Sequence, residues 1–299
     1  MLYIKELAKH GFLLEPTLTE RIDRLSQNEF DLMINELKNQ NAFLIDAETL
    51  SRFVKLEAKI ISQFQTKDKF SMQDYVNMLN RRYEFLQQIL IKKVELTNFL
   101  SINKVGIGKV GIIGFVKEKT EKGDNYVLNI EDPTGEIAVV ATKASAEKIN
   151  LDDVIAVSGN INNKIFFAEK ILLPDIPLRE PNYSFESVKV VFTNKDVEAD
   201  FVIKNNLLID FVKKKETKFE APAILEVEGV KILLVLDVDP LDVLKKRFIN
   251  KRNRDFLIEP VPDIIFNNNG VTANYKGVSI LPEDTLVYLS NRETVSLVK

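Results

Sequence analysis

The sequence predicts a multidomain α+β protein, with an N-terminal helical region, a five-stranded β-barrel and a C-terminal unit that mixes strands and helices. Three observations lead to this class. Apolar residues recur at helical spacing up to about residue 93, and from residue 101 they form short β-branched runs between turn residues. A proline-rich stretch then marks a boundary. We divide the chain into 1–64 (helical region), 71–97 (connecting helix), 98–178 (barrel) and 185–299 (mixed unit).

The composition excludes several classes of chemistry. The net charge of -3 gives no overall attraction to nucleic acid, so any DNA contact needs a local basic surface. The chain has no cysteine, which excludes disulfides, thiolate metal sites and cysteine nucleophiles. Its single histidine, His10, excludes a hydrolase built on a histidine-rich centre, and we interpret His10 as a structural or exposed helix residue. We expect no cofactor.

The first 64 residues are expected to form short helices. Pro16 with Thr17 and Thr19 marks one helix start, and residues 47–64 are expected to continue as helix. The apolar side chains that support this last helix are Phe53, Leu56, Ile60 and Ile61. The chain begins with an amphipathic stretch rather than a signal peptide, and no apolar run is long enough to span a membrane. We therefore expect a cytoplasmic protein with no membrane partner.

Residues 71–93 predict a longer helix with one apolar stripe. Its apolar residues are Tyr75, Leu79, Tyr83, Leu86, Ile89 and Leu90. Its basic residues are Arg81, Arg82, Lys92 and Lys93. A basic helix face is more commonly solvated or in contact with a partner than bound to phosphate.

Five strand-like runs then follow between residues 105 and 173, and an OB-fold is the natural candidate for so small a barrel. The stretch EDPTGE is most simply a hairpin turn, with Gly135 in the left-handed position, and needs no catalytic interpretation. Tyr126 and Phe167 could stack on bases, although at least half of such aromatics belong to the core. Because Phe166 and Phe167 are adjacent in a strand, one should face inward and the other outward.

The mixed unit contains the densest positive stretch of the chain. Residues 241–256 are expected to form a basic helix, which could contact DNA phosphates or an acidic partner, or could be a solvated face. Its cations are Lys245, Lys246, Arg247, Lys251, Arg252 and Arg254. Further along, PDIIFNNNGVTANYKG (262–277) predicts a strand, a polar turn permitted by Gly270 and a second strand that continues to residue 281.

Three stretches together resemble the small subunit of the archaeal D-family DNA polymerase, over roughly residues 75–299. The first is the barrel sequence, GIIGFVKEKTEKGDNYVLNIEDPTGEIAVV followed by LDDVIAVSGNINNKIFFAEKILLPDIP. The others are PAILEVEGVKILLVLDVDPLDVL and EPVPDIIFNNNGVTANYKGVSIL. The resemblance implies an OB-fold followed by a truncated calcineurin-like phosphoesterase α/β domain.

The resemblance also implies that a metal centre has been lost. Active members are expected to hold two metal ions for 3′–5′ exonuclease activity. The ligand positions fall here on Lys195, Val197, Leu236, Asn269 and Val271. Asp196, Asp200, Asp237 and Asp239 remain as candidates for weak Mg²⁺ binding. We expect no metal and no catalytic residue.

On this basis we expect a non-catalytic accessory subunit that docks the large catalytic subunit of a D-family polymerase. Contacts with DNA and with a sliding clamp would be made through the complex. One alternative is a free-standing OB-fold protein that binds single-stranded DNA, against which the acidic residues Asp132, Glu136, Asp152 and Asp153 argue. Another alternative is an active metal-dependent exonuclease.

Overall fold

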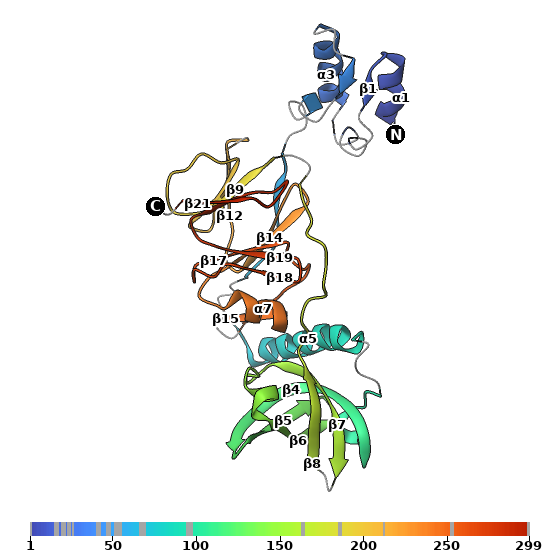
Figure 1. Cartoon of the computed structure of the whole chain (residues 1–299), viewed down its shortest axis with the longest axis vertical. Helices are drawn as coiled ribbons and strands as arrows, with labels where there is room; N and C mark the ends of the chain where they lie inside the picture. The colour runs from blue at the N-terminus through green and yellow to red at the C-terminus, as the bar shows by residue number, and fades with distance from the viewer. Residues whose placement is uncertain are drawn as a thin grey trace.

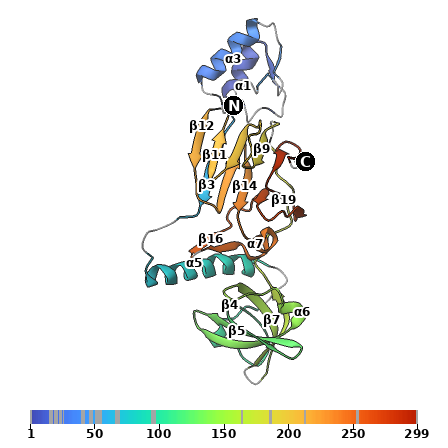
Figure 2. The ribbon, with the colours of Figure 1, turned by 90° about the vertical axis from the view of Figure 1, so that its left-hand side faces the viewer.

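The computed structural model describes residues 2–14, 18, 22, 25, 27–39, 43–45, 49–50, 56–65, 70–93, 98–162, 165–184, 187–211, 213–251 and 254–297. Three bodies follow one another along the long axis of the molecule, an N-terminal body, a two-sheet sandwich and a barrel (Figure 1). The helix α5 (Met72–Ile91) lies between the sandwich and the barrel (Figure 2).

The N-terminal body combines helices with one short pair of parallel strands. Its described elements are α1 (Leu2–Lys9), β1 (Leu13–Leu14), α3 (Gln27–Asn39) and β2 (Leu44–Ile45). Phe30, Met33, Ile34 and Leu37 recur at helical spacing in the sequence, and all four are buried on α3. The helix start expected at Pro16, Thr17 and Thr19 lies outside the described residues.

The helix expected over 47–64 is wrong at its C-terminal end. Residues Ala58–Gln63 form the strand β3, which pairs antiparallel with β13 (Ala223–Val227) at the edge of the sandwich. Ile60 packs against the sandwich core, whereas Ile61 is 36% exposed. Pairing with a distant strand has overridden a local pattern that fits either helix or strand. Phe53 lies outside the described residues.

The connecting helix is confirmed as α5. Its start is fixed by a capping box, in which Ser71 Oγ accepts a hydrogen bond from Asp74 N and Asp74 Oδ2 accepts one from Ser71 N. The buried face contains Tyr83, Leu86 and Leu90, as the apolar spacing predicts. It also contains Arg82, which the sequence placed on a basic face.

The predicted five-stranded barrel is confirmed. Its strands close in the order β4-β5-β6-β8-β7, an arrangement typical of an OB-fold. Its elements are η2 (Ile102–Lys104), β4 (Gly108–Lys122), β5 (Asn125–Asp132), β6 (Gly135–Thr142), α6 (Lys143–Ala146), β7 (Val154–Asn162) and β8 (Ile165–Leu172). Closure needs glycine at Gly159, where a Cβ would lie 2.0 Å from the carbonyl oxygen of Phe167.

The C-terminal body is a sandwich of two six-stranded sheets. One sheet has the order β12-β11-β10-β9-β20-β21, and the other β18-β19-β17-β14-β13-β3. Side chains such as Phe192 and Phe201 from the first sheet and Leu225 and Phe266 from the second share one core. The strands not yet given are β9 (Lys189–Phe192), β10 (Phe201–Lys204), β11 (Leu207–Asp210), β12 (Lys215–Lys218), β14 (Val230–Val235), β17 (Ile264–Asn267), β18 (Ala273–Tyr275), β19 (Val278–Pro282), β20 (Thr285–Tyr288) and β21 (Thr294–Ser296).

The basic helix expected over 241–256 is also wrong in its second half. The helix α7 (Pro240–Lys246) ends at Arg247, whose φ of 64° stops further helical turns. A hairpin of β15 (Phe248–Lys251) and β16 (Arg254–Leu257) follows. The hairpin buries Ile249 and Phe256, so tertiary packing separates the cations that a single helix would have aligned.

In the part of the chain that the structure describes, no helix is both long and apolar enough to cross a membrane.

Candidate functional site

The predicted polar turn after β17 is closed by the side chain of Asn267. This buried amide donates from Nδ2 to the carbonyl oxygens of Val271 and Leu281, both at 2.9 Å. Its Oδ1 accepts from the backbone nitrogens of Asn269 and Val271, both at 3.1 Å. The Asn267 side chain therefore bonds to backbone groups of Asn269, Val271 and Leu281 at once.

Two further asparagines tie this loop to the end of β14. Asn268 accepts a hydrogen bond from Asp237 N and donates one to Asp237 Oδ1, both at 2.8 Å. Asn269 Nδ2 donates to the carbonyl oxygen of Val238 at 2.8 Å. The carboxyl ends of two parallel strands are thus joined by amide and carboxylate groups that bond to each other.

The end of β9 is joined to the end of β19 in a similar way. Lys195 Nζ lies 2.8 Å from Asp284 Oδ2, and Asn194 Nδ2 donates to Glu283 Oε1 at 2.8 Å. Thr193 Oγ1 also donates to Asp284. The hydrogen bonds from Lys195 and then Thr193 lower the pKa of Asp284 from its ordinary value. An ammonium group therefore provides the positive charge next to this carboxylate.

The other predicted ligand positions carry side chains that serve packing. Val197 packs against a small apolar cluster that includes Val191 and Val202, and Leu236 packs against the sandwich core. Three of the aspartates considered for Mg²⁺ hold protein groups instead. Asp196 pairs with Lys204 at 3.2 Å, Asp200 accepts from Lys189 N at 2.8 Å, and Asp239 caps α7. Among the described residues, no three His, Cys, Asp or Glu side chains are placed to hold a metal ion.

A buried ion pair joins α5 to the β15–β16 hairpin and to the barrel. Arg82 Nε lies 2.6 Å from Asp255 Oδ2, and the two side chains are 1% and 4% exposed. Arg82 Nη1 donates to the carbonyl oxygen of Asp152 at 2.9 Å. The guanidinium also lies 4.4 Å from the ring centre of Phe248. This arginine, which the sequence placed on a basic face, is the centre of the junction.

A second buried pair joins α7 to the barrel. Lys246 Nζ lies 3.1 Å from Asp153 Oδ2 and 2.9 Å from Asp242 Oδ2. Burial raises the pKa of Asp153 to about 6, although the hydrogen bond from Asn150 and the charge of Lys246 act in the opposite direction. Arg247 is buried as well and donates to the carbonyl oxygen of Ile258. Two of the six cations proposed for DNA binding therefore lie inside the protein.

Of the remaining predicted nucleic-acid residues, Lys251 and Arg254 are cross-strand neighbours in the β15–β16 hairpin. Lys245 is half-buried above the ring of Tyr275, and Lys251 is half-buried in β15. Arg254 donates to the carbonyl oxygen of Gln65 at 2.8 Å, and Arg252 lies outside the described residues.

The two barrel aromatics differ in their surroundings. Tyr126 packs against the barrel core with Lys119 Nζ 4.2 Å from its ring centre. Phe167 is 47% exposed and Phe166 is fully buried, which confirms that one faces outward and one inward. Phe167 is therefore the aromatic that can be reached from solvent.

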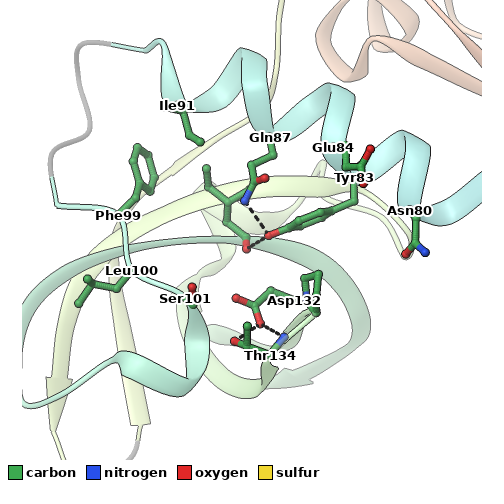
Figure 3. A pocket seen from close by; sticks show the side chains of 12 residues that line it. Asn80, Tyr83, Glu84, Gln87, Ile91, Phe99, Leu100, Ser101, Asp132 and Thr134 are labelled. Carbon is green, nitrogen blue, oxygen red and sulfur yellow. Dashed lines mark hydrogen bonds between the residues drawn. The ribbon is translucent and has the colours of Figure 1, made fainter.

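A groove of about 560 Å³ runs between α5 and the barrel (Figure 3). On one wall, Tyr83 donates to the carbonyl oxygen of Ile113 at 3.2 Å, and Gln87 Nε2 donates to Tyr83 at 3.1 Å. Burial, together with the charge of Asp132, raises the pKa of Tyr83 to about 12. The rim contains the exposed apolar side chains of Ile91 and Leu100.

The other wall is the EDPTGE turn, which joins β5 to β6 as a hairpin, as predicted. The left-handed conformation expected at Gly135 is wrong, because its φ is not positive. Asp132 accepts hydrogen bonds from Ile102 N at 2.9 Å, Thr134 N at 2.7 Å and Gly135 N at 3.0 Å. These bonds fix the turn and place a negative charge in the groove, where Glu84 of α5 adds a second. An aspartate side chain commonly accepts from the backbone nitrogen two residues later in a turn, so the sequence Asp132-Pro-Thr134 could have predicted this bond.

The sequence was also compared with known proteins. No protein-family profile matches the chain. The DNA polymerase II small subunit of Archaeoglobus fulgidus is 28% identical over 63% of this chain and 38% of its own length. That of Pyrococcus abyssi is 33% identical over 42% of this chain and 22% of its own length, and that of Methanothermobacter thermautotrophicus is 28% identical over 48% and 31%. These relatives confirm the resemblance inferred from the motifs, although the chain spans well under half of their length.

Solved structures give only weak likenesses. A chain of the Stn1–Ten1 complex of S. pombe aligns with 22% of this chain at 21% identity and a TM-score of 0.21. A chain of a replication protein A heterotrimer bound to ssDNA aligns with 22% at 20% identity and a TM-score of 0.20. We draw no conclusion about function from scores this low.

Proposed function

We propose that this chain is a non-catalytic accessory subunit of a D-family DNA polymerase and that it docks the large catalytic subunit. The observation that carries the proposal is the similarity to archaeal DNA polymerase II small subunits. For the Archaeoglobus fulgidus protein, this similarity extends over 63% of the chain.

The strand-end loops of the sandwich support a structural rather than a catalytic role. At the positions where the resemblance implies metal ligands, Lys195 holds Asp284 and Asn269 holds the carbonyl oxygen of Val238. Leu236 and Val271 offer only apolar side chains. The polar groups of these loops thus bond to one another.

The groove between α5 and the barrel is our candidate for the docking surface. Ile91 and Leu100 are 52% and 39% exposed at its rim, which is apolar area that a partner could bury. Glu84 and Asp132 make the groove acidic. We therefore propose as its occupant a segment of the large subunit that carries apolar side chains next to lysine or arginine.

The experiment is co-expression with the large polymerase subunit of the same organism, followed by affinity purification of this chain. We expect the large subunit to co-purify, and the double variant Ile91→Asp/Leu100→Asp to reduce its recovery at least tenfold. Ile107→Asp is the matched control, since Ile107 is 89% exposed and does not line the groove. No recovery with the unchanged chain would refute the proposed function. Equal recovery with the double variant would refute only the location of the docking surface.

The exposed Phe167 favours a second candidate function, single-stranded DNA binding by the barrel alone. The charges on its β4–β5–β6 face argue against it. Lys117 lies between Glu131 at 3.1 Å and Glu136 at 3.2 Å, so the carboxylates outnumber the ammonium group there. This face would repel a phosphate backbone. We therefore propose that this chain contacts DNA, and reaches a sliding clamp, as a part of the polymerase complex rather than as a free-standing binder of single strands.

A further inference from the structure

A second hollow, of about 370 Å³, lies where the barrel meets the sandwich. Lysines from four separate segments line it, namely the segment that follows α5, the turn after α6, the last turn of α7 and the turn between β18 and β19. These are Lys93, Lys148, Lys245 and Lys276. The lining includes two carboxylates, Glu147 and Asp175. The hollow is therefore positive, although the chain as a whole is negative.

One of the two carboxylates is already neutralised within the hollow. Asp175 accepts from Lys276 Nζ at 2.5 Å and from the hydroxyl of Tyr275 at 3.0 Å. Lys276 Nζ also donates to the carbonyl oxygen of Ile176 at 3.0 Å. The charges of Lys276 and Asp175 cancel, which leaves Glu147 to oppose Lys148 and Lys245.

Two of these lysines can turn their ammonium groups toward a ligand. Within the described part of the chain, neither Lys148 nor Lys245 forms an ion pair with a carboxylate. Lys148 is exposed, and Lys245 Nζ lies 5.6 Å from the ring centre of Tyr275. A cation above an aromatic ring keeps N–H groups available for an anion.

Contacts with the barrel, and with the segment that leaves it, fix the position of Lys245 at the end of α7. Lys246, the neighbour of Lys245, makes the buried ion pair with Asp153 of the barrel. The carbonyl oxygen of Lys245 accepts from Asp175 N at 2.6 Å. The end of α7 is thus anchored against both the barrel and the segment that leaves it. A site whose charges are held in place loses less entropy when it binds an anion.

We propose that this basic hollow binds phosphate groups of the DNA backbone. The choice of DNA over other polyanions rests on the proposed function, while the positive charge and concave shape are properties of the hollow itself. Lys148 and Lys245 make the principal phosphate contacts. Phosphate contacts carry no sequence information, so the hollow positions the duplex rather than reading it.

The test is fluorescence anisotropy of a labelled duplex oligonucleotide with the full chain in a salt series, without the large subunit. The double variant Lys148→Ala/Lys245→Ala should weaken binding at least tenfold at low salt. Because each phosphate contact contributes about 0.9 to the slope of log K against log salt, the slope should become shallower by about 2. Lys213→Ala/Lys214→Ala removes the same charge from exposed lysines outside the hollow, and should change the affinity less than threefold.

Three outcomes would overturn the inference. The first is no binding of the duplex by the unchanged chain at low salt, and the second is an equal loss of affinity in the Lys148/Lys245 and Lys213/Lys214 double variants. The third is displacement of the duplex by poly-glutamate at a lower charge concentration than by unlabelled DNA. The last result would assign the hollow to acidic peptides. Lys148→Arg/Lys245→Arg keeps both positive charges and should retain binding. This variant therefore distinguishes the loss of charge from a loss of folded structure. Recovery of the large subunit in the co-purification is measured independently, so failure of this inference leaves the proposed function standing.

Discussion

At the scale of single residues, buried charges decide how the bodies are joined. A positive charge read from the sequence has no known partner, so Arg82, Lys246 and Arg247 were counted as surface residues. The structure gives each of them a partner that is distant in sequence or on another element. By contrast, the opposite orientations of Phe166 and Phe167 and the buried stripe of α3 were predictable, because alternation and helical spacing are local properties.

The ion pair between Arg82 and Asp255 yields a prediction about stability. Arg82→Met should lower the free energy of unfolding by about 3 to 5 kcal/mol, because it leaves Asp255 buried without a compensating charge. The double variant Arg82→Met/Asp255→Leu should recover a substantial part of that loss. Urea unfolding monitored by circular dichroism measures both. Arg81→Met changes the exposed neighbour on the same helix and should stay within about 0.5 kcal/mol of the unchanged protein. A loss in Arg82→Met no larger than in Arg81→Met would contradict the prediction.

At the scale of elements, the sequence separated helical from strand-like regions well in the barrel and in α5. The barrel strands pair mostly with sequence neighbours, and they were all predicted. β3 and the β15–β16 hairpin were predicted as helix. An apolar run as short as that of β3 fits both periods, and only its distant partner β13 decides between them. The strand-end loops were predictable as turns, but the hydrogen bonds that Asn267 makes within its loop were not.

Adjacent isoleucines in β3 give a direct test of this assignment. In a helix, the substitutions at positions 60 and 61 would have similar effects, whereas in β3 only Ile60 packs against the sandwich core. Ile60→Ala should lower the free energy of unfolding of the sandwich by about 2 to 4 kcal/mol. Ile61→Ala, at the half-exposed neighbour, should cost less than about 1 kcal/mol. Chemical denaturation of the two variants measures the difference, and equal losses would count against the strand.

At the scale of the whole molecule, the barrel and the sandwich are held together by α5, α7 and the hairpin. The buried ion pair between Lys246 and Asp153 connects α7 to the barrel. Neither the proline-rich boundary nor the charge pattern indicated such a contact, because the two residues belong to different predicted domains. The order of the domains was readable from the sequence, whereas the surfaces between them required the fold.

The raised pKa of Asp153 makes the stability of this joint depend on pH. Its pKa of about 6 in the folded protein exceeds the ordinary value of 3.8, so the folded state binds more protons between these two values. The contribution of Asp153 to the free energy of unfolding therefore falls by roughly 2 to 3 kcal/mol in total as the pH rises from about 4 to about 6. Relative to the unchanged protein, Asp153→Asn should thus gain stability between pH 4 and pH 7. Urea unfolding at both pH values measures this change, and a difference between the two proteins that does not vary with pH would refute it.

The position of β3 in the chain also has a consequence for how the protein is made. Gln63 of β3 pairs with Ala223 of β13, and the whole barrel lies between them in the sequence. At the usual rate of translation, about 10 to 30 seconds pass between the emergence of the two strands from the ribosome. During that time the barrel, which follows β3 in the sequence, can fold. β13, the strand with which β3 pairs, has not yet emerged. The sandwich can therefore be completed only after synthesis has passed the barrel, and the barrel is expected to be the first of these two bodies to reach its native structure.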